Sequence, residues 1–558
     1  MSRSPKPRAV VVTGAAVGIG AAIAEELGRL GVFVVTLDAN VTVDGSGPAE
    51  TAGRTTAERI VDAGGAARSV DCSVTDAVAV TEAFQRVVDD FGALDAVVNV
   101  AGISRPTSFT RGSERDWTDV LGVHLDGYLT VLRAALPLMA AAGHGRIVGV
   151  TSGSGWRAAD AGAYGCAKRA VAALTWQLGK VAPPGVTVNA LSPVAATRMV
   201  AAAATRAAAA GRAATGGISL AGFPPPDHLG PVGAFLASEA LAWCSGRIFF
   251  SAGAELALIA EPRIVEAVRG RPSAAPAGVL AEVVPAAFVP AEASQASGAG
   301  SNARFAEVFD SVRDERPAPD GPASRSCLVV ADDPVRRDDV VSVLERRGTR
   351  CAVITDPAGG FRGAAEQFAV AVAGLHGVDA VVVAIEGVPS SYPRTSSDRW
   401  RAVLDDHVGV SDRIRGDAAW ARAVAEHAVS TNRAVRLVTL CPAVDAGGRS
   451  RAQAVAQLSR AARPATGDLV TACSVSCESD QEADRAPIAE LVGHLVVGPD
   501  TEALAGAELC VGPGWWGLRS HPVPSGTISF GGPSVPAWLN DAVREIVEGP
   551  DVATRRGG

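Results

Sequence analysis

The sequence predicts an α/β protein made of two tandem, doubly wound parallel-sheet domains, of which the second is a degenerate copy of the first. Three observations predict this fold class. Short apolar runs alternate with longer helical patterns over residues 9–260, as in repeated βαβ units. The alternation resumes after residue 326, behind a stretch rich in Pro, Ala, Ser and Gly. The two halves also share a pattern at a constant offset.

Length and composition limit the possible functions. A chain of 558 residues exceeds one ordinary core, so we expect two main domains. The net charge of −8 is spread without a basic block, which argues against nucleic acid and anionic membranes as partners. Because neither a leader nor a membrane-length apolar run is evident, we expect a cytoplasmic protein. The nine cysteines, including the pair Cys473 and Cys477, are expected to be reduced, buried thiols without a metal.

The domain boundaries follow from the composition. We expect a cofactor-binding, catalytic domain over residues 1–270, a linker with one short helix over 271–325, and the degenerate domain over 326–558. The clearest strands expected in the first domain are Ala9 to Thr13, Phe33 to Leu37, Ala96 to Val100, Arg146 to Thr151 and Thr187 to Leu191.

The repeat is visible in three separated elements. Trp117 and His124 match Trp400 and His407, with the same spacing inside each pair. LDAVV at 94–98 matches VDAVV at 378–382, and AVAAL at 170–174 matches AVAQL at 454–458. The offset is 283 to 284 residues throughout, which indicates a tandem duplication rather than chance.

A glycine-rich turn predicts a dinucleotide site in a Rossmann-like domain. The first strand runs into TGAAVGIG at 13–20 and then into an amphipathic helix, whose free N–H groups attract a pyrophosphate. The second strand ends at Asp38, where a carboxylate binds ribose hydroxyls and repels a 2′-phosphate. The turn has no Arg or Lys, so we expect NAD(H) to be preferred over NADP(H). The alternative is a structural turn followed by an ordinary surface Asp.

A tyrosine and a lysine form the expected catalytic pair. Tyr164 and Lys168 stand four residues apart on one face of a predicted helix, so the ammonium could stabilise a phenolate and lower its pKa. Ser152 follows a strand and lies near the carboxyl edge of the sheet, where it could hydrogen-bond the reacting oxygen. Ser154 is the weaker candidate for that role.

Together these motifs resemble the short-chain dehydrogenase/reductase family over residues 8–260. The motifs and residues on which this resemblance rests are TGxxxGIG at 13–20, Asp71 in DCS, NVAG at 99–102, Ser152 and YGCAK at 164–168. The resemblance implies an oxidoreductase in which Tyr164 is the acid/base, Lys168 holds the nicotinamide ribose and Ser152 positions the substrate. The cofactor-binding residues it implies are Gly14, Val17, Gly18, Ile19, Gly20, Asp38, Asp71, Cys72, Asn99, Ala101, Gly102, Tyr164, Lys168, Pro193, Val194 and Thr197. The substrate-binding residues it implies are Ser152, Ser154, Trp156, Tyr164 and Met199.

Some positions depart from the family pattern. The family motif NNAG is NVAG in this sequence, and the family's Pro-Gly pair is Pro193-Val194. His124 stands where the family has its catalytic Asn. His124 is expected either to relay protons or to bend its helix, and we leave both open. This histidine, SGSG at 152–155 and the insertion after Asp38 are most similar to the hydroxyacyl-CoA dehydrogenase part of multifunctional enzymes, with hydroxysteroid dehydrogenases as neighbours.

The substrate is expected to be a bulky, hydrophobic ketone or alcohol. Residues 199–226 are rich in Ala, with Arg206 and Arg212, where the family keeps mobile substrate-covering helices; a plain surface helix is the alternative. Two other functions compete: an epimerase or dehydratase related to this family, and an NAD-binding sensor or scaffold without turnover. An epimerase or dehydratase of this kind needs a substrate domain at the place where this chain has a repeat. A sensor or scaffold would not need Ser152, Tyr164 and Lys168, and all three are present.

The second half is expected to have lost the chemistry. An offset of 317 puts Ala331, Val335 and Arg337 opposite the three glycines, while Leu440, Gly448 and Ala452 face Ser152, Tyr164 and Lys168. The Trp400 helix and the AVAQL helix persist, and in the family these helices form subunit interfaces. We therefore expect an intramolecular pseudo-dimer with one NAD site, which could associate further into a homodimer. The alternatives are a decaying duplicate that packs elsewhere and a domain with another ligand.

Overall fold

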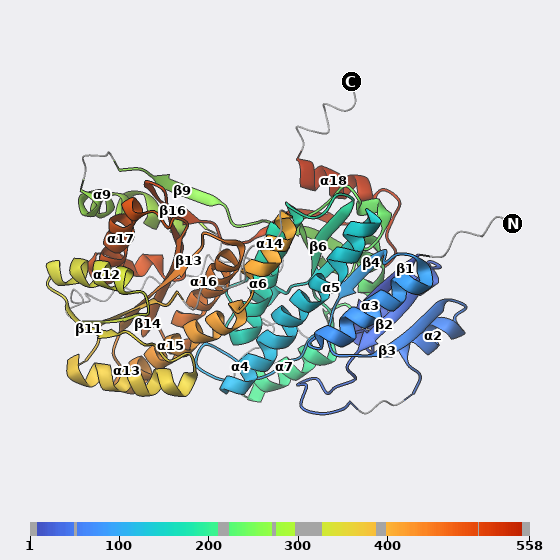
Figure 1. Cartoon of the computed structure of the whole chain (residues 1–558), viewed down its shortest axis with the longest axis horizontal. Helices are drawn as coiled ribbons and strands as arrows, with labels where there is room; N and C mark the ends of the chain where they lie inside the picture. The colour runs from blue at the N-terminus through green and yellow to red at the C-terminus, as the bar shows by residue number, and fades with distance from the viewer. Residues whose placement is uncertain are drawn as a thin grey trace, which may run out of the picture.

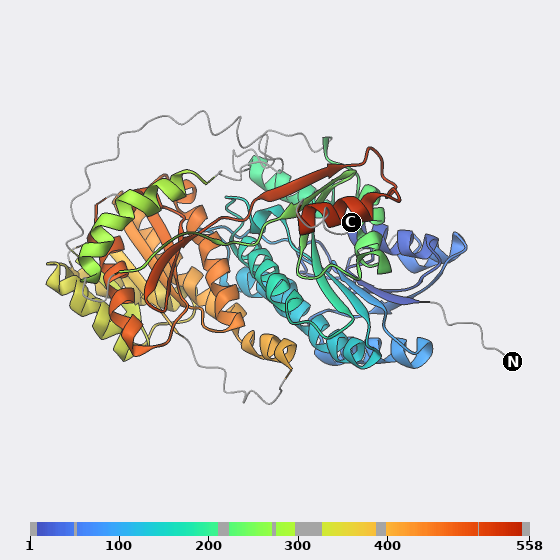
Figure 2. The same cartoon turned by 90° about the horizontal axis from the view of Figure 1, so that it is seen from above.

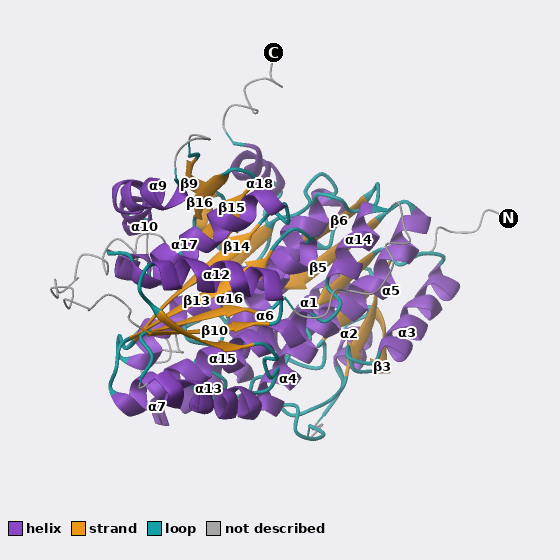
Figure 3. Cartoon of the chain, turned by 60° about the vertical axis from the view of Figure 1, so that its left-hand side comes forward, coloured by secondary structure: helices purple, strands orange, loops and turns teal. Residues whose placement is uncertain are grey.

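The computed structural model describes residues 8–49, 53–209, 222–270, 275–295, 326–375, 377–386, 398–499 and 501–549. Within these residues, a nine-stranded and an eight-stranded sheet form two units that lie side by side, each with helices on both faces (Figure 1, Figure 3). Helices α6 and α16 pack against each other where the units meet. The predicted tandem α/β fold is confirmed.

The first unit has the sheet order β17-β8-β7-β6-β5-β4-β1-β2-β3. Its strands from the first half are β1 Ala9–Thr13, β2 Phe33–Asp38, β3 Ala66–Asp71, β4 Ala96–Asn99, β5 Gly145–Val150, β6 Val186–Pro193, β7 Ile248–Ala252 and β8 Glu255–Ile259. Its helices are α1 Gly18–Arg29, α2 Thr56–Asp62, α3 Ala77–Phe91, α4 Glu114–Leu121, η1 Gly122–Asp126, α5 Gly127–Ala142, η2 Gly153–Gly155, α6 Gly162–Gly179, α7 Arg198–Ala209, η4 Pro226–Leu229, α8 Gly230–Leu236 and η5 Glu239–Leu241. The expected strands are confirmed to within two residues at each end.

The second unit has the order β11-β10-β12-β13-β14-β15-β16-β9. Its strands are β9 Ile264–Val268, β10 Ser326–Ala331, β11 Arg350–Ile354, β12 Ala380–Ala384, β13 Val435–Pro442, β14 Val470–Cys477, β15 Glu508–Gly512 and β16 Trp515–Arg519. Its helices are α9 Pro276–Val283, η6 Val284–Phe288, α10 Val289–Ala293, α12 Pro334–Arg346, α13 Phe361–Leu375, α14 Arg399–Asp406, α15 Val410–Thr431, α16 Ala446–Thr466, η7 Glu482–Asp484, α17 Arg485–Val497 and η8 Thr501–Leu504.

The two units exchange strands, so the sheets divide the chain differently from the expected boundaries at 270 and 326. Strand β9 pairs antiparallel with β16 of the second sheet. Strand β17, Pro524–Ser529, returns to the first unit and pairs antiparallel with β8, followed there by α18, Leu539–Glu548 (Figure 2). Periodicity identifies a strand but not its tertiary partner, which is why sequence reasoning placed both segments in the wrong unit.

One hydrophobic core runs through both units. Trp117 and Leu125 of the first half belong to the same buried cluster as Trp420 and Leu458 of the second. The rings of Trp117 and Phe361 lie 5.7 Å apart, centroid to centroid. A shared core of this kind resembles an obligate interface, so the units are expected to depend on each other for stability.

Among the residues that the structure describes, two helical stretches meet the length and hydropathy of a membrane span. Residues 114–142 lie mostly inside the first unit, while residues 276–293 are more exposed but bury Leu280, Val284 and Phe288 in the second core. All nine cysteines are free, and eight are buried; Cys351 is only half-buried, contrary to expectation.

Candidate active site

The turn after β1 is built for close backbone approach. Gly14 has a φ of 64°, and a Cβ there would lie 2.6 Å from the backbone nitrogen of Ala101. A Cβ on Gly20 would lie 2.1 Å from the carbonyl oxygen of Gly14. Beside Gly18, at a φ of 63°, no described atom lies within 4 Å of a Cβ position. The turn therefore leaves open space where a pyrophosphate could approach the backbone.

The N-terminus of α1 keeps its N–H groups available. Its N-cap residue is Val17, whose apolar side chain cannot accept a hydrogen bond and is 45% exposed. The amides of Gly18 and Ile19 follow it in the first turn. Free N–H groups at the positive end of a helix dipole favour an anion. The residues present therefore fit the pyrophosphate of a dinucleotide.

Asp38 ends β2 beside this turn. Its carboxylate accepts the N–H groups of Ala16, at 2.9 Å, and of Asn40, at 2.8 Å. The next strand ends at Asp71, which accepts a 3.4 Å hydrogen bond from the Asn40 side chain and is followed by buried Cys72. The structure thus gathers the expected ribose and adenine residues at one edge of the sheet.

The end of β4 is tied to the glycine turn. Thr13 donates from Oγ1 to Asn99 Oδ1 at 2.8 Å and accepts from the amide of Ala101 at 3.2 Å. Gly102 follows, and a Cβ there would lie 2.3 Å from the ring of His124. Sequence reasoning did not assign Thr13 a role, although it begins the TGxxxGIG motif and could have been identified there.

The expected catalytic residues do meet. Tyr164 and Lys168 lie on α6, and the Tyr164 hydroxyl is close enough to the Ser152 side chain, beyond β5, for the serine to lower the tyrosine pKa. Lys168 Nζ donates to the carbonyl of Val150 at 2.6 Å and lies 5.8 Å from the centre of the Tyr164 ring. The hydroxyl of Thr151 donates to the Lys168 carbonyl at 2.7 Å and so fixes α6 to the end of β5.

Burial dominates the pKa values of this pair. It raises the pKa of Tyr164, an effect that the hydrogen bond with Ser152 opposes. It lowers the pKa of Lys168 from 10.5 to about 7. Since Lys168 is held by the Val150 carbonyl, the expected lowering of the tyrosine pKa is not seen in this geometry. A lysine with a pKa near 7 can instead take up and release a proton at neutral pH.

His124 is buried within a π-helical turn, η1, beside Tyr164. Its ring centre lies 5.0 Å from that of Tyr164, edge to face, and its Nε2 lies 2.8 Å from the carbonyl oxygen of Ile103. Burial and the charge of Lys168 lower its pKa to about 3, so the ring stays neutral. Such single π turns are frequent at functional sites. The contact with Ile103 gives His124 a structural anchor, and its relay role stays a prediction.

The substrate side is only partly described. Pro193 ends β6 beside β7, and the amide of Val194, the next residue, donates to the Ser251 carbonyl at 2.9 Å. The hydroxyl of Thr197 accepts the amide of Val200 at 3.2 Å, at the start of the α7 helix that carries Met199. The Arg206 side chain and Arg212 lie outside the described residues.

Trp156 does not take the substrate-facing position expected of it. The side chain is 1% exposed, its indole donates to Ser192 Oγ at 3.0 Å, and it packs edge to face on Phe250. It anchors the loop after β5 to the core. The same loop receives hydrogen bonds from Gln457 and Arg460 of the second half, residues that sequence reasoning missed because only tertiary packing brings them close.

The second half differs from the first at the places that correspond to the glycine turn and to Ser152. Strand register confirms that Gly14 corresponds to Ala331. The α12 helix is capped by its own carboxylate, Asp333, which accepts the amide of Arg336 at 2.6 Å. The strand register also corrects one prediction. Gly145, the first residue of β5, and Val435, the first residue of β13, each pair with the first residue of the next strand in their sheet. Counting forward from these two residues, Ser152 corresponds to Pro442 and not to Leu440.

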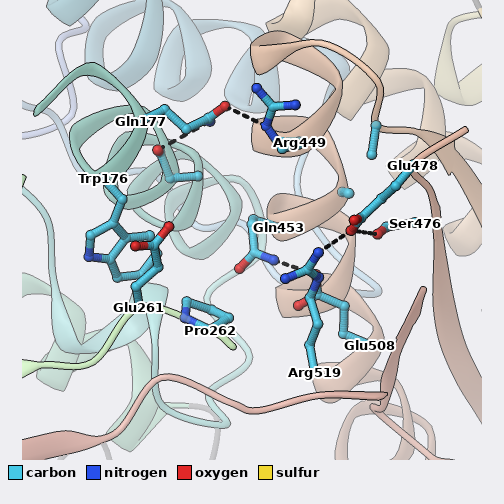
Figure 4. Close-up of a pocket in the computed structure, with 13 residues that line it drawn as sticks. Trp176, Gln177, Glu261, Pro262, Arg449, Gln453, Ser476, Glu478, Glu508 and Arg519 are labelled. Carbon is cyan, nitrogen blue, oxygen red and sulfur yellow. Dashed lines mark hydrogen bonds and ion pairs between the residues drawn. The ribbon is translucent and has the colours of Figure 1, made fainter. Parts of the chain in front are cut away.

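A pocket lies between the halves, near the place that a second active site would occupy (Figure 4). Ala452, the counterpart of Lys168, lines it together with Glu478, while Trp176 and Glu261 come from the first half. Arg519 is bonded to Glu478 in its floor. The side chains that line this pocket include no tyrosine or lysine for the chemistry expected at Tyr164.

Comparisons with known proteins agree with this geometry. A family model for a short chain dehydrogenase matches residues 8–208. The short-chain reductase protein NovJ of Streptomyces niveus is 39% identical over 192 residues, which are 34% of this chain and 70% of that one. Hydroxyacyl-CoA dehydrogenase ChsB1 of Mycobacterium tuberculosis is 32% identical over 267 residues, 46% of this chain and 81% of that one. The NADP-bound N-domain of a bacterial malonyl-CoA reductase, 17% identical, shares the fold over 90% of this chain and 97% of its own, with a TM-score of 0.63.

Proposed function

Because the chain belongs to the short-chain dehydrogenase family, we propose that its first half is an NAD(H)-dependent oxidoreductase that interconverts a secondary alcohol and a ketone. The single observation that carries this proposal is the meeting of Tyr164 with Ser152, which is close enough to lower the tyrosine pKa, with Lys168 on the same helix as Tyr164. Two hydroxyls that converge at the carboxyl edge of a parallel sheet can both bind one substrate oxygen.

The cofactor would be held by the glycine turn, the first turn of α1 and Asp38. When bound, NAD+ supplies the acceptor for the hydride that leaves the alcohol carbon. The Asp38 carboxylate, placed by the amides of Ala16 and Asn40, supports NAD(H) over NADP(H), because a 2′-phosphate there would meet a negative charge.

The protein's own residues move the proton. Ser152 donates to the substrate oxygen and holds it at Tyr164, which accepts the hydroxyl proton in oxidation and returns it in reduction. In oxidation Tyr164 passes its own phenolic proton to neutral Lys168 as it accepts the hydroxyl proton, and in reduction Lys168 returns a proton to Tyr164; with its pKa near 7, Lys168 can exchange that proton with solvent. His124, neutral and adjacent to Tyr164, is the candidate for a relay.

The proposed substrate is bulky and hydrophobic: a hydroxyacyl thioester, a steroid-like alcohol or a secondary metabolite. The similarity to a hydroxyacyl-CoA dehydrogenase supports the first class, and the similarity to the NovJ reductase is compatible with the last. A cytoplasmic location is part of the same proposal.

We further propose that the second half is an intramolecular partner that replaces a second subunit. Arg169 on α6 donates to Gln453 on α16 at 2.8 Å, and these two residues are themselves separated by the repeat offset. A residue that meets its own counterpart marks a pseudo-two-fold axis. Ser411 Oγ also donates to Asp126 at 2.7 Å, and Arg133 to the Leu404 carbonyl at 2.9 Å.

Substitution of Tyr164 tests the function. In Tyr164→Phe we expect NADH formation from secondary alcohols, steroids or 3-hydroxyacyl thioesters to fall by about 100- to 10,000-fold, with NAD binding retained, because only the acid/base is removed. Tyr128→Phe removes the same atom from another buried tyrosine and should keep its activity. Near-normal turnover of Tyr164→Phe would end the proposed mechanism.

A further inference from the structure

The loop after β5 joins Ser152 to the helix of Tyr164. Inside the loop, the amide of Gly155 donates to the Ser152 carbonyl at 2.9 Å, and the amide of Arg157 donates to the Gly153 carbonyl at 2.9 Å. The amide of Ser154 also donates to Ser152 Oγ, at 3.2 Å. The position of the Ser152 hydroxyl therefore depends on the conformation of residues 153–157.

Two side chains of the second half hold this loop. Gln457 Nε2, on α16, donates to the carbonyl of Ser154 at 3.0 Å and to that of Arg157 at 2.8 Å. Arg460, one turn further along α16, donates from Nη1 to the carbonyl of Trp156 at 2.8 Å. Three carbonyls of one short loop are thus satisfied by a segment about 300 residues away in sequence.

The amide of Gln457 is committed to this contact. The side chain is 2% exposed, and both protons of its nitrogen are used by the loop, whereas Oε1 has no hydrogen-bond partner among the described residues. Rotating the amide would bring Oε1 against two carbonyl oxygens and leave those carbonyls without donors, which costs more than one unpaired oxygen. The orientation of Gln457 is therefore set by the loop.

The second half holds a loop of the first half, but the first half does not hold an equivalent loop of the second. At the repeat offset, Gln457 and Arg460 correspond to Ala173 and Trp176 of α6. Ala173 and Trp176 meet no equivalent loop, because residues 153–161 of the first half are reduced to 443–445 in the second. They line the pocket between the halves instead (Figure 4). The second half has lost its own loop and holds that of the first.

We propose that Gln457 and Arg460 are positioning residues for the reaction of the first half: they hold residues 153–157 so that Ser152 can bind the substrate oxygen beside Tyr164. This inference rests on the proposed function. It makes the second half a part of the active-site scaffold and not only a cover for the apolar face of α6.

The test compares matched variants in the full chain. Gln457→Leu removes both donors at similar volume. Gln177→Leu is the control, because Gln177 also bridges the halves, to the Ala446 carbonyl at 3.2 Å and Ser450 Oγ at 3.1 Å, without touching the loop. We expect kcat to fall by about 10- to 100-fold in Gln457→Leu, with the NAD dissociation constant unchanged, and little change in Gln177→Leu. Arg460→Met should behave like Gln457→Leu, and Arg460→Lys, which keeps a donor, should recover part of the loss.

Hydrogen exchange of residues 153–158 gives a readout that needs no substrate. In Gln457→Leu the amides of Gly155 and Arg157 should exchange faster, because loop opening costs less, while those of Gln177→Leu should match the wild type. Unchanged exchange in Gln457→Leu, or an equal loss of kcat in both variants, would overturn the proposal. If Tyr164→Phe stays active while loop exchange rises as expected, the proposed function fails but the positioning contact stands.

Discussion

The helices that follow β1 and β10 occupy equivalent places in the two halves but begin differently. Helix α1 begins at a valine N-cap beside a left-handed glycine, so its first N–H groups stay available. Helix α12 begins with a proline behind Asp333, whose carboxylate accepts one of those N–H groups and would repel a phosphate. The second half satisfies its helix with its own atoms, which stabilises the fold and removes the site.

The loops at the active-site edge show the same contrast. Where the first half has residues 153–161, the second has 443–445, and the Asp445 carboxylate there caps α16 by accepting the amide of Gly448 at 2.6 Å. The helices α6 and α16 nevertheless keep their apolar contact. The two halves therefore differ most at loops and turns, whereas they share the helix surfaces through which they pack together.

The largest expected effect comes from separating the halves. A chain ended after residue 270 lacks β17 and α18, and with them Ile528, Leu539 and Val543 of the first core. We expect it to aggregate or to be inactive, because an edge strand and an apolar helix face are exposed. Size-exclusion chromatography and the NADH assay would show this.

A second shortened chain separates the two contributions of the missing residues. Joining residues 520–549 to the chain that ends at 270 restores β17 and α18 to the first sheet and core. This addition should raise solubility without restoring full activity, because the contacts of α16 with α6 and with the loop after β5 are still missing. A monomeric, fully active first half would refute the pseudo-dimer.

The glycine turn offers the next comparison. Gly14→Ala places a Cβ against the Ala101 backbone at a left-handed φ, so we expect NAD affinity to fall by about tenfold or more. Ala331→Gly, at the corresponding place in the second half, should leave NAD binding unchanged. Isothermal titration should give one site per chain for the wild type, and two sites would show that the second half still binds the cofactor.

The acidic residue at the end of β2 sharpens the comparison further. Asp38→Ala combined with Ala39→Arg should shift the NAD to NADP preference by about tenfold or more, since a charge-assisted hydrogen bond replaces repulsion. The ratio of kcat/KM with NAD to kcat/KM with NADP measures this preference. Asp44→Ala removes an exposed carboxylate from the following loop and should not change the ratio. A wild-type preference for NADP would contradict the assignment of Asp38.

The last comparison concerns the stability of the fold and Lys168, whose counterpart Ala452 carries no charge. Burial lowers the Lys168 pKa to about 7, so between pH 7 and 10.5 the unfolded chain binds more protons than the folded one. The free energy of unfolding should therefore rise with pH in this window, by up to about 1.4 kcal/mol per pH unit relative to Lys168→Met. Denaturant unfolding of both proteins at several pH values tests this, and parallel curves would exclude it.

The sequence alone determined the fold class, the first-half strands and the meeting of Ser152, Tyr164 and Lys168. These follow from local rules: alternation predicts βαβ units, strands of a parallel sheet end at one edge, and residues four apart share a helix face. The repeat offset also placed Ala331 opposite Gly14, as the strand register later confirmed.

Only the tertiary structure decided which sheet β9 and β17 join, that Trp156 is a core side chain, and that Gln457 and Arg460 hold the loop of the other half. It also decided the state of Lys168, whose pKa depends on burial and on the Val150 carbonyl. Each of these depends on groups far apart in sequence. Periodicity and spacing report on neighbours along the chain, while strand exchange, desolvation and contacts between halves arise only when the chain has packed.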